Sequence, residues 1–228
     1  MNLINKIDYT LLNPSATEDQ IIELCKKAND LGVKSVCVLP KMVSVAVKEL
    51  KNSNVLICTV ISFPHGTDST EDKLEETKKA IADGADECDM VLNYHMLKKC
   101  HIIEDLVDDV STLVTECHLN DVILKVIVES GLLSEDETTE ATQVCLEAGA
   151  DFIKTSTGMV SVGAELRKVQ IMKNIITDAH SHMKIKASGA IRTMSDIERF
   201  EPYVDRFGVG FAAVDSIFDG QTMGDNSY

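Results

Sequence analysis

The chain has 228 residues, of which 44% are hydrophobic and 26% charged, so it is long enough to bury a sizeable core and too apolar to be disordered. Its 37 acidic and 22 basic residues give a formal net charge of -15, which disfavours binding to nucleic acid or to an anionic membrane surface. The longest apolar stretch, residues 55–63, is too short to span a bilayer, and the N-terminus lacks the layout of a signal peptide, so we expect a cytoplasmic protein.

Short β-branched segments alternate along the chain with longer segments of helical periodicity. Strands are predicted at residues 34–39, 55–63, 88–92, 122–128, 152–155, 184–187 and 204–208, and residues 7–12 could supply an eighth strand ahead of the first helix. Helices are predicted at residues 18–31, 71–82, 103–117, 135–147 and 165–177.

This alternation predicts an α/β fold, because strands that alternate with helices pair in parallel through right-handed crossovers. We expect a single-domain (β/α)8 TIM barrel over residues 1–218, with a short N-terminal segment and a polar, mobile C-terminal tail at residues 219–228. An open, doubly wound sheet is the main alternative, but the G-x-G-x-x-G phosphate loop of that fold is missing after the first strand.

A weak internal echo places four residues at similar depth in the predicted barrel. Gly84-Ala85-Asp86 and Gly149-Ala150-Asp151 each end a helix and enter a strand. Three residues beyond the aspartate, or beyond its equivalent in two other strands, the chain carries Asp89, Lys154, Cys37 and Gly208. In this fold the chemistry lies at the carboxyl ends of the strands, so these positions are candidates for the site.

A lysine lies inside each of three strands that otherwise look buried: Lys125, Lys154 and Lys186. A single buried lysine is usually ion-paired or extends to the surface, but three on neighbouring strands suggest a cluster. A second ammonium and removal from water favour the neutral form of a lysine, which then attacks carbonyl carbon. The resulting iminium loses a proton to give an enamine that forms or breaks a C–C bond.

Two aspartates are candidates for partners of these lysines. Asp89, inside an apolar strand, could relay protons through a water molecule, or it could simply neutralise a strand lysine. For Asp8, composition alone favours a helix or turn cap.

Six segments match the pattern of one known family: residues 7–14, 35–40, 84–91, 124–129, 151–158 and 186–193. The K-T-S-T-G segment begins at Lys154 and the K-A-S-G segment at Lys186, two of the lysines already singled out. From about residue 6 to its end, the chain closely resembles the 2-deoxyribose-5-phosphate aldolases.

The resemblance implies a metal-independent lyase of deoxyribose phosphate catabolism, with no cofactor. It would join acetaldehyde to D-glyceraldehyde 3-phosphate reversibly. Lys154 matches the Schiff-base lysine, Lys186 the lysine that depresses its neighbour's pKa and takes part in proton transfer, and Asp89 the proton shuttle. Residues expected to bind substrate are Asp8, Thr10, Cys37, Lys125, Thr155, Gly158, Gly189, Ala190, Gly208 and Gly210.

Two further expectations come from the same family. The terminal Tyr228 matches a tail tyrosine thought to assist proton transfer in one branch, although simple disorder of the tail is an equal alternative. A homodimer is common among these enzymes, and whether Cys37 is reactive or merely buried stays open.

The departures from the family pattern gather where the phosphate of the substrate would bind. Ala190 and Val162 each replace a common glycine, and residues 209–212 stand where a Ser-Ser pair is expected, so two hydroxyl donors are lost and Phe211 adds bulk. One interpretation is an aldolase of the same mechanism that prefers unphosphorylated aldehydes. The other is that backbone N–H groups of Gly189, Ala190 and Gly210 still hold the phosphate.

Two rival functions remain on the sequence. Metal catalysis is disfavoured because no zinc-binding spacing occurs among the six histidines, which are His65, His95, His101, His118, His180 and His182. The seven cysteines include no C-x-x-C pair and are interpreted as reduced thiols. A non-catalytic binding barrel is the second rival, but Lys154, Lys186 and Asp89 are all retained.

Overall fold

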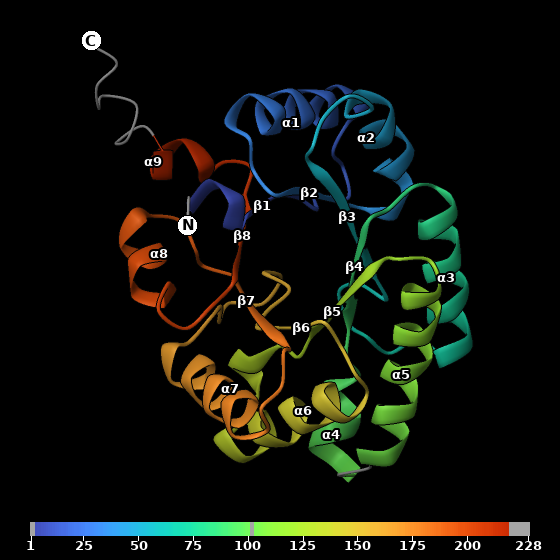
Figure 1. Cartoon of the computed structure of the whole chain (residues 1–228), viewed down its shortest axis with the longest axis vertical. Helices are drawn as coiled ribbons and strands as arrows, with labels where there is room; N and C mark the ends of the chain where they lie inside the picture. The colour runs from blue at the N-terminus through green and yellow to red at the C-terminus, as the bar shows by residue number, and fades with distance from the viewer. Residues whose placement is uncertain (1–2, 101–102, 219–228) are drawn as a thin grey trace.

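A computed structural model describes residues 3–100 and 103–218 of the chain. Within these ranges eight parallel strands close into a barrel in chain order, with each strand bonded to the next and β8 bonded to β1 (Figure 1). The strands are β1 (Ile7–Leu11), β2 (Ser35–Val38), β3 (Leu56–Ile61), β4 (Glu87–Val91), β5 (Ile123–Ile127), β6 (Phe152–Lys154), β7 (Lys184–Ser188) and β8 (Arg206–Gly210). The (β/α)8 barrel predicted from the sequence is confirmed.

Helices surround the barrel on the outside (Figure 1). They are α1 (Glu18–Leu31), α2 (Val43–Glu49), α3 (Thr70–Ala82), α4 (Tyr94–Cys100), α5 (Ile103–Leu119), α6 (Glu135–Glu147), α7 (Leu166–Asp178), α8 (Met194–Phe200) and α9 (Val214–Phe218). Short 3-10 turns occur at Leu3–Lys6, Pro40–Met42 and Ser130–Leu132.

The five predicted helices and eight predicted strands are all found, with ends that differ by at most two residues. The sequence prediction missed α2, α4, α8 and α9, which have five to seven residues each. A helix of two turns or fewer shows too few repeats of its apolar face to be recognised by periodicity. The predicted tail, residues 219–228, and with it Tyr228, lies outside the described residues.

Local sequence signals explain where the long helices start and stop. Thr17 and Ser134 each form a capping box. The cap side chain accepts a hydrogen bond from the third helical N–H, and the side chain of that third residue accepts one from the backbone N–H of the cap residue. Gly32 ends α1 with φ of 70°, a left-handed conformation that glycine adopts without steric cost. Among the described residues, no helix combines the length and hydropathy needed to cross a membrane.

Strand β4 shows how the barrel separates apolar from charged side chains. All five of its residues are buried. Cys88 and Met90 belong to the apolar core between the strands and the helices, whereas Glu87 and Asp89 contact lysine side chains from across the barrel. Because strand residues alternate between faces, the barrel wall is apolar outside and charged inside.

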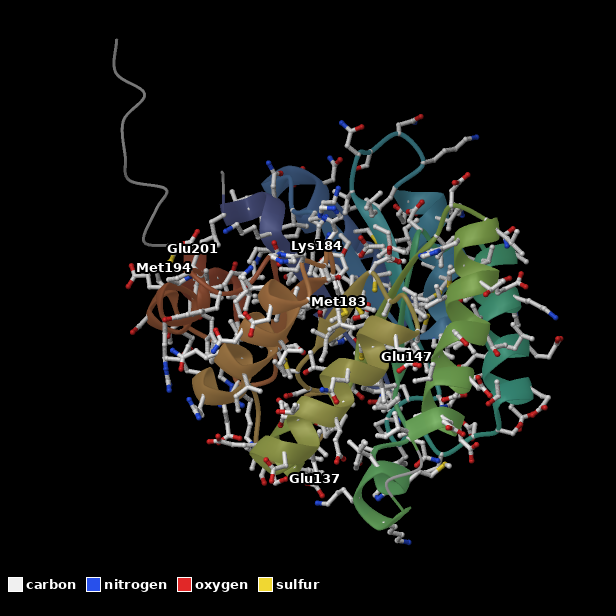
Figure 2. The ribbon with its side chains drawn as sticks, turned by 60° about the horizontal axis from the view of Figure 1, so that its bottom comes forward. Glu137, Glu147, Met183, Lys184, Met194 and Glu201 are labelled. Carbon is white, nitrogen blue, oxygen red and sulfur yellow. The ribbon has the colours of Figure 1, made fainter. Side chains whose placement is uncertain are left out.

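The two ends of the barrel differ. In Figure 2, Glu147 at the end of α6 lies on the same side of the molecule as Met183 and Lys184, where β7 begins. Glu137, near the start of α6, lies towards the opposite end. The helices therefore run back along the barrel, and the carboxyl ends of the strands open at the end where the helices start.

Candidate active site

Asp89 is the centre of a buried cluster inside the barrel. The Nζ atoms of Lys154 and Lys186 lie 2.8 and 2.7 Å from its Oδ2 atom, and the Nζ of Lys125 lies 2.8 Å from Oδ1. The side chains of Asp89, Lys125 and Lys186 are fully buried, and that of Lys154 is 3% exposed. The three lysines singled out by their place in the strands thus meet on a single carboxylate.

A second set of charges lies next to this centre. Lys186 lies 2.5 Å from Asp8 Oδ2, and Arg206 donates to Asp8 and to Glu87, the latter at 2.9 Å. Lys125 donates to Glu87 at 2.6 Å. The interpretation of Asp8 as a helix or turn cap is wrong: Asp8 is the second residue of β1, fully buried, and its carboxylate points into the barrel towards Arg206.

Neighbouring charges determine the protonation states of Asp89 and Lys186. Burial by itself would raise the pKa of Asp89, but Lys125, Lys154 and Lys186 together hold it well below the usual range of a carboxyl. Burial would likewise lower the pKa of Lys186, but Asp8 and Asp89 raise it above that of a free lysine. At neutral pH, Asp89 is therefore an anion and Lys186 is a cation.

The cluster has one cation more than it has anions. Four cations face three carboxylates: Lys125, Lys154, Lys186 and Arg206 against Asp8, Glu87 and Asp89. Lys154 has ion-pair contact with Asp89 alone, whereas Lys186 and Arg206 each contact two carboxylates and Lys125 contacts three. Lys154 is therefore the cation of this cluster with the fewest anionic partners.

Lys186 also lies close to Lys154. Since Lys154 and Lys186 bond to the same oxygen, their nitrogens lie no more than about 5.5 Å apart. At an effective dielectric constant of 20, two ammonium groups at that distance repel by roughly 3 kcal/mol.

A cavity of about 700 Å³ opens beside Lys154. This volume is typical of small-molecule sites. Six residues predicted to bind substrate line it, namely Thr10, Gly158, Gly189, Ala190, Gly208 and Gly210. The cavity thus gives a ligand access to the one lysine of the cluster that borders open space.

The other four predicted binding residues do not line this cavity. Asp8 and Lys125 lie in the charged cluster beneath it, and Cys37 is fully buried on β2. Thr155 is also buried, and its hydroxyl links β6 to β7 by donating to Ser188 O at 2.9 Å and accepting from Ser188 N at 3.0 Å. These four residues support the cavity from below.

Gly208 leaves room for Lys186. A Cβ atom at this position would lie 2.8 Å from the Cβ of Ser188 and 3.4 Å from the Cε of Lys186. Any larger residue would therefore push β7 away, together with Lys186. Of the four residues predicted at similar depth, Asp89 bonds to Lys154 at 2.8 Å and has the Sγ of Cys37 within 4.8 Å of a carboxylate oxygen, while Gly208 lies next to Lys186.

The outer part of the cavity is mostly apolar. Met159 is half exposed there, with Ile191, Ala212 and Ala213 beside it, and Arg192 adds one cation. The expectation that Phe211 adds bulk to this region is wrong, because Phe211 does not line the cavity and its ring stacks on Tyr9 with centroids 5.6 Å apart.

Backbone donors are available in the same region. Gly189 and Ala190 have φ of 79° and 62°, so two successive residues are left-handed. Within the described residues, no backbone or side-chain oxygen accepts a hydrogen bond from their N–H groups. Such unpaired amides suit an anionic ligand group.

One set of potential metal ligands occurs among the described residues: Cys37, Cys58 and Asp89, whose ligand atoms lie within 4.8 Å of one another. The three ammonium groups on Asp89 oppose a divalent cation there. A hydrogen bond from Cys58 and the nearby lysines lower the pKa of the Cys37 thiol despite its burial. The six cysteines with described side chains are free.

Sequence reasoning missed several charged or polar residues of this region, including Glu87, Arg206, Glu129 and Thr157. The first two could have been found by alternation, since Glu87 is two residues before Asp89 and Arg206 is two residues before Gly208. No sequence signal points to Glu129 or Thr157, which interact with each other across a loop.

Comparisons with known proteins show which family the chain resembles. A model of the DeoC/LacD family of aldolases matches residues 3–205. A deoxyribose-phosphate aldolase of Mycoplasmoides pirum is 46% identical over 199 residues, which cover 87% of this chain and 88% of the relative.

Two solved structures resemble the whole barrel. One, titled a putative deoxyribose-phosphate aldolase from Coccidioides immitis, has a TM-score of 0.91 and 37% identity and covers 96% of this chain and 85% of its own. The other, a deoxyribose phosphate aldolase from Aeropyrum pernix described as tetrameric, has a TM-score of 0.86 and 28% identity and covers 97% of this chain and 92% of its own.

Proposed function

The chain belongs to the DeoC/LacD family of aldolases, and we propose that it cleaves 2-deoxy-D-ribose 5-phosphate reversibly into acetaldehyde and D-glyceraldehyde 3-phosphate. The observation that carries this proposal is the pair of lysines on one oxygen of Asp89, with Lys154 facing the cavity. That arrangement supplies an amine able to attack a carbonyl beside a permanent cation and a carboxylate.

The reaction starts with the amine of Lys154. It adds to the C1 aldehyde of the open-chain sugar, and loss of water leaves an iminium. The iminium draws electrons from the C2–C3 bond as the 3-hydroxyl gives up its proton. This bond breaks, glyceraldehyde 3-phosphate leaves, and an enamine remains on Lys154. Protonation at C2 and hydrolysis then release acetaldehyde and restore the amine.

Asp89 and Lys186 handle the protons of these steps. In the resting cluster Asp89 is ionised, so it enters as a proton acceptor that contacts Lys154 directly. Lys186 stays positive on the same oxygen and is the donor beside it. Since the two groups meet at one atom, a proton taken from substrate passes between them, directly or through a water molecule, without leaving the site.

Appearance of acetaldehyde from 2-deoxyribose 5-phosphate, followed by a coupled alcohol dehydrogenase, tests the proposal. Activity should survive EDTA, vanish in Lys154→Leu, and persist in the matched control Lys184→Leu, which changes a lysine at the far end of β7. A pure, folded protein with no cleavage would instead favour a binding barrel.

A second candidate function concerns the acceptor aldehyde. The apolar outer cavity, with Met159 exposed and hydroxyl donors absent from residues 209–212, favours an aldolase of the same mechanism that takes unphosphorylated aldehydes. The unpaired amides of Gly189 and Ala190 favour the phosphate. Comparison of kcat/KM for deoxyribose with and without its 5-phosphate decides between them, and a preference of about 100-fold for the phosphate, or roughly 2.7 kcal/mol, rejects the second candidate.

The assembly and location of the protein are part of the proposal. We expect a homo-oligomer, with a dimer as the simplest form, and a cytoplasmic location. Light scattering of the pure protein tests the first expectation, and cell fractionation tests the second.

A further inference from the structure

Glu129 has an unusual backbone conformation at the edge of the site. It lies two residues beyond the end of β5, with φ of 50° and ψ of 51°. This left-handed conformation costs an L-residue about 1 kcal/mol or more, and glycine would adopt it freely. Strain at a non-glycine residue beside a site is a reason to look for what its side chain does.

The side chain of Glu129 is fully buried, and among the described residues its carboxylate accepts hydrogen bonds from Thr157 alone. The Thr157 N–H donates to Oε2 at 3.2 Å and to Oε1 at 3.4 Å, and the Thr157 hydroxyl donates to Oε2. The same hydroxyl accepts a hydrogen bond from the N–H of Met159 at 3.1 Å. Glu129 therefore holds the backbone of Thr157 directly and that of Met159 through the Thr157 hydroxyl.

These bonds hold the wall of the cavity. Strand β6 ends at Lys154, and Thr157, Gly158 and Met159 line the cavity immediately beyond it. Backbone hydrogen bonds hold the part of this segment that is closest to β6. Val128 N–H donates to Lys154 O at 3.0 Å, and Ser130 N–H donates to Thr155 O at 2.7 Å. Beyond Thr155, the Glu129 side chain holds Thr157.

Glu129 forms no salt bridge that would compensate for its burial. Among the described residues, no lysine or arginine nitrogen lies within ion-pair distance of its carboxylate. Burial raises the pKa of Glu129, while the hydrogen bonds from Thr157 and, to a smaller extent, the charge of Lys154 lower it in part. A buried carboxyl group without an ion pair costs free energy, so its hydrogen bonds to Thr157 are its main compensation.

We propose that Glu129 is a positioning residue for the aldol reaction, which acts through Thr157 to hold residues 155–159 as the cavity wall beside Lys154. This inference rests on the proposed function, because it assigns a role in that reaction. Glu129 does not touch the reacting atoms, so its effect falls on the binding of the sugar more than on the chemical step.

Four variants test this role: Glu129→Ala, Glu129→Gln, Thr157→Val and the double variant Glu129→Ala/Thr157→Val. The matched control is Thr142→Val, which removes a buried threonine hydroxyl bonded to Thr138 O within α6, away from the cavity. Amide hydrogen exchange of residues 155–165 without substrate measures how firmly the cavity wall is held. Steady-state kinetics with 2-deoxyribose 5-phosphate report KM and kcat separately.

Glu129→Ala should speed exchange at the amide of residue 157 and Thr157→Val at the amide of residue 159, and each should raise KM about 10-fold, with a smaller fall in kcat. The double variant should raise KM by less than the product of the two single effects, since both single variants remove the bond from the Thr157 hydroxyl to Glu129. Glu129→Gln should stay within about 3-fold of the parent, because a single oxygen accepts both bonds from Thr157. Thr142→Val should leave exchange and KM unchanged.

The proposal is overturned if Glu129→Ala keeps the parent exchange rates and KM, or if Glu129→Gln is as damaging as Glu129→Ala. Failure of the proposed function looks different. In that case the parent protein does not cleave the sugar phosphate, while the exchange data still show whether Glu129 holds the segment.

Discussion

Lys154 and Lys186 donate hydrogen bonds to the same oxygen of Asp89, at 2.8 and 2.7 Å. They come from neighbouring strands in register, so the barrel fixes the separation of the two amines. A carboxylate that binds two ammonium groups stabilises both, yet the cluster holds four cations against three anions. The excess of one cation is therefore the functional feature of the site, and Lys154 is the cation with the fewest anionic partners.

Replacing Lys186 with methionine removes that excess. With three cations and three carboxylates left, the amine of Lys154 loses the cationic neighbour that activates it as a nucleophile, and kcat/KM should fall about 100-fold, the equivalent of roughly 3 kcal/mol. The pH dependence of kcat/KM should shift to higher pH in Lys186→Met. Lys184→Met, on the same strand, should keep the parent profile, and an unshifted profile in Lys186→Met would refute the charge argument.

Asp89→Asn should damage both stability and activity. It leaves three buried lysines without their shared anion, so we expect a loss of about 3–5 kcal/mol in the free energy of unfolding, as for other broken buried pairs. Asp109→Asn is the control, since it breaks the buried pair with Lys73 between α3 and α5. Urea denaturation should show destabilisation in both variants, whereas folded Asp109→Asn should retain its activity and folded Asp89→Asn should not.

Stability should fall in acid because of two carboxyls. The pKa values of Asp8 and Asp89 are lower in the folded chain than in the unfolded one, so the stability they add is present above about pH 4 and is lost as the pH falls. Two such groups give a limiting slope of roughly 2.7 kcal/mol per pH unit. Urea unfolding at pH 7, 5, 4 and 3 measures this slope, which should be about half as steep in Asp8→Asn. Equal stability at pH 7 and pH 3 would show that the two carboxyls are not held this way.

Ala190→Gly probes the strained turn over the cavity. Ala190 has φ of 62°, so glycine relieves about 1–2 kcal/mol of strain but costs about 0.4–1 kcal/mol through the freer unfolded chain. Ala179→Gly is the control, because Ala179 has φ of -76° and gains nothing from glycine. The difference in unfolding free energy between the two variants should be about 1–2 kcal/mol in favour of Ala190→Gly. No difference would mean that the turn is not strained.

The fold and the three lysines could be read from the sequence for a physical reason. Each long helix has several turns of apolar periodicity, and Lys125, Lys154 and Lys186 stand out because charge is rare in buried strands. Glu87 and Arg206 could also have been predicted to face the inside of the barrel, because each lies two residues before a candidate position on the same strand.

Other features depend on the closed barrel and have no local signal. The place of Asp8 is one of these features, because an aspartate is as typical of a cap as of a site and its partner Arg206 is 198 residues away. The left-handed backbone of Glu129 and its contact with Thr157 are not revealed by any pattern in either segment. The stacking of Phe211 on Tyr9 is equally a product of the β1–β8 contact that closes the barrel.

Borohydride trapping tests the central claim most directly. The protein is incubated with acetaldehyde at pH 7, reduced with borohydride, digested and mapped by mass spectrometry. Our account predicts one added ethyl group, on the peptide that contains Lys154, and none in Lys154→Leu. An adduct on Lys186 or Lys125 instead, or no adduct in an active enzyme, would contradict it.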